Sequence, residues 1–136
     1  MVDRATIERT IREAYDARQR GDHAGVVACF APNATYRLVG KSHLLGEMPV
    51  GPIDAVAAIG GLIDQFHFPQ LRLAALLIDG NRAAVHVEMH AVATGSRAES
   101  ASELLDLWTF DDDGKVTDIT EFADTALIGH MLFGTR

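Results

Sequence analysis

The segment at residues 103–110, with the sequence ELLDLWTF, is the feature that most constrains the fold. Successive side chains of a β-strand point to opposite faces of the sheet. One face of this strand therefore carries Leu104, Asp106, Trp108 and Phe110, and the other carries Leu105, Leu107 and Thr109. Both faces are largely apolar, so both must be covered. Helices of the same chain cover one face only. We expect a second copy of the chain to cover the other, and so predict a homodimer.

The whole sequence predicts a single α+β domain over residues 1–136. Its length of 136 residues is close to the roughly 150 residues of one domain. Apolar spacing and capping residues predict helices at residues 6–20, 22–30 and 54–66. Alternating patterns predict strands at residues 34–39, 71–79, 82–94, 103–110 and 115–122. A loop rich in Gly and Pro is expected at residues 40–52, and a short helix or an arm at residues 124–133. Helices followed by an antiparallel meander indicate the α+β class.

The charge of the chain excludes two kinds of partner. Twelve Lys and Arg residues against 19 Asp and Glu residues give a net charge of −7, without a basic cluster. Nucleic acids and anionic membranes would be repelled. Cys29 is the only cysteine, which excludes an internal disulfide. The N-terminal residues are charged throughout, unlike a secretory signal, so we expect a cytoplasmic protein.

Two segments of the sequence resemble the NTF2-like superfamily, and most closely its SnoaL-like and ketosteroid-isomerase-related members. They are GDHAGVVACFAPNATYRLVG, at residues 21–40, and ATGSRAESASELLDLWTFDDDGKVTDITEFADTAL, at residues 93–127. The resemblance implies a cone in which a curved antiparallel sheet wraps around N-terminal helices and encloses an apolar pocket. It also implies a homodimer. Under this resemblance residues 1–136 form one SnoaL-like domain.

Ketosteroid isomerase activity itself is not expected. Aligned with that enzyme, Asp106 takes the position of the aspartic acid in the oxyanion hole, but Leu38 takes the position of the catalytic base. Leucine cannot accept a proton. The tyrosine of the oxyanion hole aligns with Ala14, and Tyr15 is one residue further along, about 100° around the helix.

Polyketide cyclases and epoxide hydrolases of the superfamily place acidic residues on their later strands. The matching residues here are Asp106 and Glu121, on two successive predicted strands. If both point inward they form a carboxyl pair in an apolar cone, where their pKa values are pushed apart as acid–base catalysis requires. We therefore predict Asp106, Glu121 and Tyr15 as catalytic residues. The alternative for Asp106 is a structural carboxylate bonded to a neighbouring donor. For Glu121 it is a solvated residue near a strand end, and for Tyr15 a core residue of the first helix.

Five apolar side chains are predicted to line the pocket and contact a ligand: Trp108, Phe66, Met89, Leu38 and Ile119. The alternative for each is ordinary core packing. His86, Glu88 and His90 share one strand face, but the alignment assigns the pocket to Val85, Val87 and Met89. This places the histidines on the outer face, and we predict no metal site. Without a Gly-rich phosphate loop, no cofactor is expected either.

The sequence leaves three hypotheses for function. The first is a cofactor-free cyclase, isomerase or epoxide-hydrolase-type enzyme that acts on a small hydrophobic molecule. The second is a non-catalytic binder of a similar ligand. The third is a dimerisation module whose pocket is a packed core. The superfamily hosts all three roles, so fold alone does not decide among them.

Overall fold

The computed structural model describes residues 1–40 and 52–134 of the chain. The elements in chain order are α1 (Arg4–Arg20), α2 (His23–Val27), β1 (Phe30–Leu38), β2 (Ile53–Asp54), α3 (Ala55–Gln65), β3 (Phe66–Asp79), β4 (Arg82–Ala93), β5 (Glu99–Phe110), β6 (Val116–Ala123) and α4 (Thr125–Phe133). Most of the loop predicted at residues 40–52 lies outside the described residues. The predicted α+β class is confirmed.

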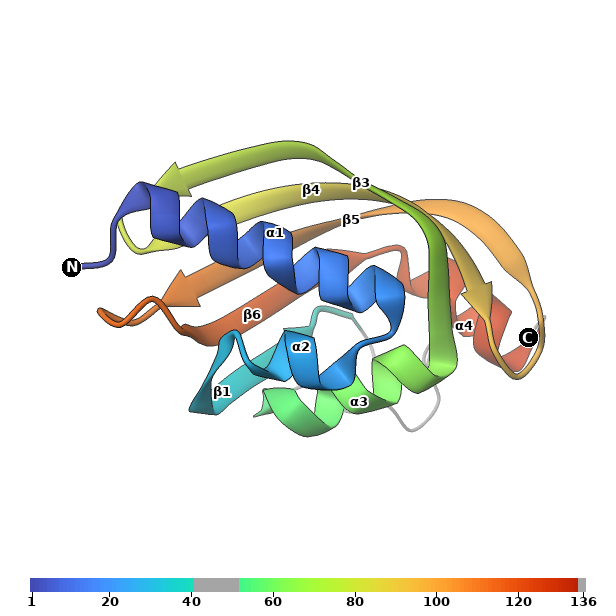
Figure 1. Cartoon of the computed structure of the whole chain (residues 1–136). Helices are drawn as coiled ribbons and strands as arrows, with labels where there is room; N and C mark the ends of the chain where they lie inside the picture. The colour runs from blue at the N-terminus through green and yellow to red at the C-terminus, as the bar shows by residue number, and fades with distance from the viewer. Residues whose placement is uncertain (41–51, 135–136) are drawn as a thin grey trace.

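The strands form one six-stranded sheet in the order β2-β1-β6-β5-β4-β3. It curves around α1, α2 and α3, which lie on its concave side (Figure 1). From β3 to β6 the pairing is antiparallel, as the sequence predicts. The pair β1–β6 is parallel, which differs from the expected antiparallel sheet. Parallel neighbours need a long crossover connection. Here α3 and the whole β3–β5 meander provide it.

Helix α1 forms for reasons that are visible in its sequence. The side chain of Asp3 accepts a hydrogen bond of 2.7 Å from the backbone N–H of Thr6, which caps the first turn. Gly21 ends the helix in the left-handed region, with φ of 70°. The buried side chains recur at helical spacing and are Ile7, Thr10, Ile11, Ala14, Tyr15 and Ala17. Through this stripe α1 packs on the sheet, and Tyr15 contacts Asp106 and Trp108 on β5.

Helix α3 is continuous through Gly60 and Gly61, although two glycines weaken a helix. Asp54 caps it by accepting a bond from the N–H of Ala57. At Gly60 the helix approaches α2 closely, because a Cβ atom there would lie 3.3 Å from Nε2 of His23. The helix was predicted to include Phe66, but Phe66 is extended, with φ of −134°, and begins β3. Its side chain thereby points to the inner face of the sheet.

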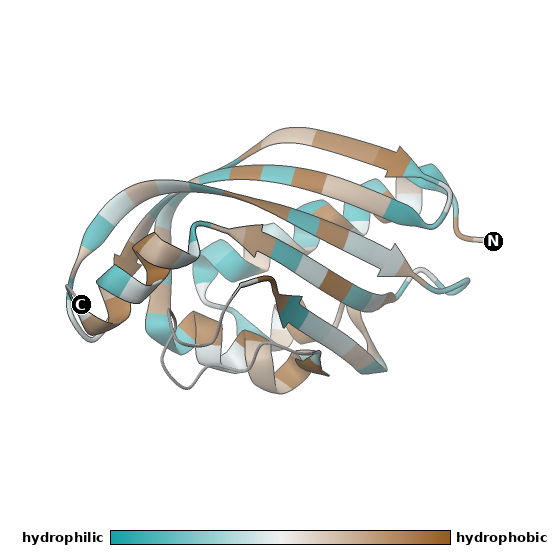
Figure 2. Cartoon of the chain, turned by 180° about the vertical axis from the view of Figure 1, so that it is seen from behind, coloured by the Kyte–Doolittle hydropathy of each residue, from teal (hydrophilic) through white to brown (hydrophobic). Residues whose placement is uncertain are grey.

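The two faces of the sheet differ as the alternation in residues 103–110 predicts. On the inner face Asp106, Trp108 and Phe110 are buried against the helices. On the outer face Leu105 is 37% exposed and Phe122, opposite it on β6, is 43% exposed. The outer face of the strands lies in front of α1 in Figure 2, and apolar and polar residues alternate along these strands. In the part of the chain that the structure describes, both side chains thus remain partly open to solvent.

The C-terminal segment forms a helix, α4, where the sequence allowed a helix or an arm. Asp124 caps it through the N–H of Leu127. The hydroxyl of Ser96 donates to the carbonyl of Met131 and ties the helix to the β4–β5 turn. Within residues 1–40 and 52–134, no helix is long and apolar enough to cross a membrane.

Candidate functional site

A cavity of about 120 Å³ lies between the inner face of the sheet and the helices. Its wall is mostly apolar. All eight residues predicted for catalysis or ligand binding line it: Tyr15, Leu38, Phe66, Met89, Asp106, Trp108, Ile119 and Glu121. They come from α1, β1, β3, β4, β5 and β6, so the fold gathers residues that are far apart in the sequence. Their catalytic and binding roles remain predictions.

Two carboxyl groups lie side by side in this cavity. Asp106 on β5 is directly opposite Glu121 on β6 in the antiparallel register. Directly opposed residues share one face of a sheet, with Cβ atoms ~4.5–5.5 Å apart. Asp106 is buried, with 6% of its surface exposed, and Glu121 is half-buried. The two carboxyl groups therefore lie together because both residues point to the inner face and the register of β5 and β6 places them opposite each other.

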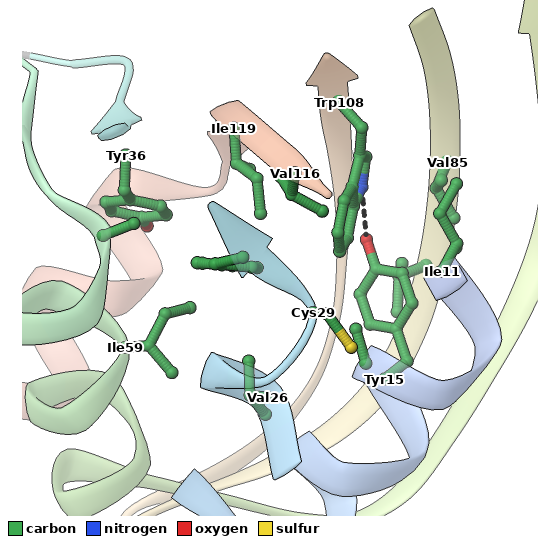
Figure 3. Close-up of a cluster of buried hydrophobic side chains, with 14 of the residues drawn as sticks. Ile11, Tyr15, Val26, Cys29, Tyr36, Ile59, Val85, Trp108, Val116 and Ile119 are labelled. Atoms are coloured by element: carbon green, nitrogen blue, oxygen red, sulfur yellow. Dashed lines mark hydrogen bonds between the residues drawn. The ribbon is translucent and has the colours of Figure 1, made fainter. Parts of the chain in front are cut away.

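Asp106 is held by a tyrosine. The hydroxyl of Tyr15 donates to Oδ2 of Asp106 over 2.5 Å and accepts a bond of 3.2 Å from Nε1 of Trp108. The Tyr15 and Trp108 rings also meet edge to face, with centroids 5.4 Å apart. Figure 3 shows the Trp108–Tyr15 bond within the buried cluster. Oδ1 of Asp106 is buried and has no hydrogen-bond partner among the described residues.

Glu121 is held by a second tyrosine, which the sequence analysis did not include. The hydroxyl of Tyr36 donates to Oε2 of Glu121 over 2.7 Å. Tyr36 is 5% exposed and lines the same cavity. The signal was present in the sequence, because Tyr36 has the same strand parity as Leu38, which was assigned to the pocket.

Arg18 is the second residue that the sequence analysis missed. It follows Tyr15 by three positions and Ala14 by four, so it lies on the same side of α1. Its Nη2 atom donates to the carbonyls of Leu62 and Phe66, over 3.1 and 2.9 Å. The guanidinium also lies 4.1 Å from the centre of the Phe68 ring. Among the described residues that line the cavity, Arg18 is the only basic one.

The sequence matches the family model of the SnoaL-like domain over residues 11–119. The chain belongs to the SnoaL-like family. Among curated proteins, none matches the sequence.

Solved structures agree with this SnoaL-like fold. An NTF2-like protein of unknown function from Burkholderia pseudomallei K96243 is 20% identical, with a TM-score of 0.73 over 94% of this chain and 98% of that chain. TerC, co-crystallised with polyporic acid, is 17% identical, with a TM-score of 0.73 over 93% and 98% of the two chains. An LEH-like epoxide hydrolase from Mycobacterium tuberculosis is 16% identical, with a TM-score of 0.70 over 96% and 92%. At these identities the similarity establishes the fold alone.

Burial raises the pKa of both carboxyl groups in the SnoaL-like cavity, and their different neighbours distinguish them. Desolvation raises the pKa of Asp106 well above its ordinary value, and the charge of Glu121 raises it further, against the opposing bond from Tyr15. Desolvation also raises the pKa of Glu121, but the bond from Tyr36 and the charge of Arg18 oppose this rise. Each carboxyl group has a tyrosine donor, but the charge of Arg18 favours the charged form of Glu121, whereas the charge of Glu121 disfavours that of Asp106.

Leu38 is placed where the alignment with ketosteroid isomerase puts it, on the cavity wall with 4% exposure. Its partner in the parallel β1–β6 register is Glu121. A carboxyl group thus stands on the strand next to the position where that enzyme carries its base. Tyr15, although displaced by one residue in the alignment, has its hydroxyl on Asp106.

The polar side chains of β4 form pairs with residues of the neighbouring strands on the other side of the sheet. The pairs are His86 with Glu103 at 2.7 Å, His90 with Glu99 at 3.1 Å, and Glu88 with Arg72 at 2.6 Å. Possible ligand atoms of His86, Glu88 and Glu103 lie within 4.8 Å of one another, but Glu88 is engaged by Arg72. Neither histidine lines the cavity, in agreement with the predicted outer position.

Proposed function

We propose that this SnoaL-like protein is a cofactor-free acid–base enzyme acting on a small hydrophobic molecule, of the isomerase, cyclase or epoxide-hydrolase type. The observation that carries the proposal is the Asp106–Glu121 pair, opposed in register within one apolar cavity. Two carboxyl groups whose surroundings favour different protonation states have the arrangement required of an acid and a base.

In this proposal Glu121 is the base and Asp106 is the acid. Tyr15 occupies Oδ2 of Asp106, so the acidic proton belongs on Oδ1, which has no partner among the described residues. That proton is available to an oxygen atom of the substrate. Glu121 removes a proton from a carbon atom next to a carbonyl group, or from a water molecule that attacks an epoxide. In the second case the new C–O bond forms as the ring C–O bond breaks, and the ring oxygen takes the proton of Asp106.

Two of the structural relatives support this choice of chemistry. One is described as an epoxide hydrolase, and TerC was crystallised with polyporic acid, a small organic molecule. The apolar wall of the cavity suits a hydrophobic substrate.

The test compares turnover with binding in two conservative variants. Asp106→Asn and Glu121→Gln keep the size of each side chain but remove its ionisation. Steroid-, terpenoid- and polyketide-like ketones and epoxides are the probes, and quenching of Trp108, the only tryptophan, reports binding. We expect turnover to fall about 100-fold or more in both variants while binding persists. Asp113→Asn, exposed in the β5–β6 turn, is the control and should retain full turnover.

The alternative outcomes are distinct. Binding without turnover in the wild type would favour the second hypothesis, a ligand binder that uses the same apolar cavity. If no compound changes Trp108 emission while the chain remains folded, the result would favour the third hypothesis, a dimerisation module.

A further inference from the structure

Arg18 has more hydrogen-bonding capacity than its structural contacts use. Its Nη2 atom donates to the carbonyls of Leu62 and Phe66, at the C-terminal end of α3. These bonds cap the helix, which is a common structural role for arginine. No hydrogen bond joins its Nε or Nη1 atom to the described residues, although a guanidinium donates from all three nitrogens. Helix capping therefore does not account for the whole guanidinium.

Arg18 and Glu121 line the same cavity, without an ion pair within 4.0 Å between them. The other titratable residues of the cavity wall are Asp106 and Glu103 on β5, Tyr36 on β1 and Tyr15 on α1. None of these four can carry a positive charge. Desolvation lowers the pKa of Arg18 to about 10, and the charge of Glu121 opposes that shift. Even so, the guanidinium remains charged at neutral pH. Each ion thus favours the charged form of the other.

We propose that Arg18 is a positioning residue that holds the negative charge of the carboxyl pair on Glu121 and thereby fixes which carboxyl group acts as the base. The inference rests on the proposed function, because the assignment matters only if the pair transfers protons. Without the cation, the two carboxyl groups differ only in their burial and in their tyrosine partners. The proton would then be shared more evenly, and a smaller fraction of molecules would hold the acid and base in the required states.

The experiment follows the ionisation of Glu121 directly by ¹³C NMR of the side-chain carboxyl groups, without any substrate. Glu121→Gln assigns the resonance. In Arg18→Gln we expect the titration midpoint of Glu121 to rise by about one pH unit, the lower end of the effect of a nearby opposite charge. Arg18→Lys retains the charge and should shift the midpoint by less than half as much. Arg20→Gln removes the same charge from an exposed position on the same helix and should leave it unchanged.

The Arg18 variants also separate positioning from helix capping. Both alter the bonds to α3, so both should lose stability, but Arg18→Gln should move the midpoint more than twice as far as Arg18→Lys. An unmoved midpoint in folded Arg18→Gln would reduce Arg18 to a capping residue. If that variant does not fold, the wild type still decides, because the proposal requires Glu121 to ionise at lower pH than Asp106. The reverse order would overturn it. Absent turnover in the wild type would instead defeat the proposed function and leave the titration result standing.

Discussion

Carboxyl groups on the two faces of the β4–β5–β6 sheet differ in their exposure and in their hydrogen-bond partners. On the outer face Glu103 and Glu99 are exposed and pair with histidines across the strands. On the inner face Asp106 is buried and Glu121 is half-buried, and each accepts a hydrogen bond from a tyrosine hydroxyl. Solvent screens the outer pairs, whereas burial raises the pKa of both inner groups. Glu103 and Asp106, three positions apart on β5, therefore differ in exposure because strand parity places them on opposite faces.

If the outer face is a dimer interface, its disruption should convert the dimer completely to monomers. Leu105 and Phe122 oppose each other in register and are both exposed in the single chain, as is Leu77 at 68%. We expect light scattering at micromolar concentration to report about twice 14.7 kDa for the wild type. Leu105→Glu should yield the monomer mass. Ala5→Glu adds the same charge at an exposed position on α1 and should remain dimeric. A monomeric wild type would show that this face needs no cover.

On the inner face the largest effect should be a pH-dependent gain in stability of Asp106→Asn over the wild type. Burial raises the pKa of Asp106 in the folded chain, so ionisation favours unfolding above its ordinary pKa of ~3.9. The penalty is absent below that value and grows by at most about 1.4 kcal/mol per pH unit towards the folded pKa. Above the folded pKa it is fully present. Asparagine avoids it, and denaturant unfolding of both proteins at several pH values measures the difference.

A trend of the opposite sign would identify Asp106 as a paired structural anion and remove it from the proposed mechanism. Asp113→Asn serves again as the control, because its exposed side chain should give no such trend.

The contrast between the faces was predictable because it depends on local alternation. The pattern of residues 103–110 correctly separates buried Asp106 and Trp108 from exposed Leu105. The same parity, applied to residues 34–39, would have added Tyr36 to the site. Periodicity reports which face a side chain occupies, and most of the inner wall follows from it.

What the sequence did not predict depends on contacts between distant segments. The parallel pairing of β1 with β6 brings Leu38 beside Glu121 across 83 positions, and no local pattern encodes it. Arg18 appears as an ordinary polar residue of a helix until the end of α3 is placed against it. The one-residue offset of Tyr15 in the alignment gave no sign that its hydroxyl would donate to Asp106.

Removing the tyrosine hydroxyls should change the free energy of unfolding by less than the ionisation of Asp106 does. Tyr15→Phe leaves Oδ2 of Asp106 and Nε1 of Trp108 without their partner, at a cost of about 1–3 kcal/mol. Tyr36→Phe removes one bond to Glu121 and should cost less. Denaturant unfolding gives both values, and Trp108 emission should shift only in Tyr15→Phe. Equal emission changes in the two variants would contradict the separate pairing of each carboxyl group with its own tyrosine.

The smallest effect is expected for an outer pair of equal apparent quality. Nε2 of His86 and the carboxylate of Glu103 are 2.7 Å apart, a separation as short as that of the Tyr36–Glu121 bond. The side chains are 38% and 65% exposed, so water competes for both groups and salt screens their attraction. Glu103→Gln should therefore change the free energy of unfolding by less than about 1 kcal/mol. Glu121→Gln, the same substitution on the inner face, should change it by more and with a dependence on pH. If a dimer covers the outer face, Glu103 is no longer solvated, and Glu103→Gln would change the free energy of unfolding by more. The measurement is therefore made in the monomeric Leu105→Glu background, where a small change can be attributed to exposure, because the distance in the two pairs is the same.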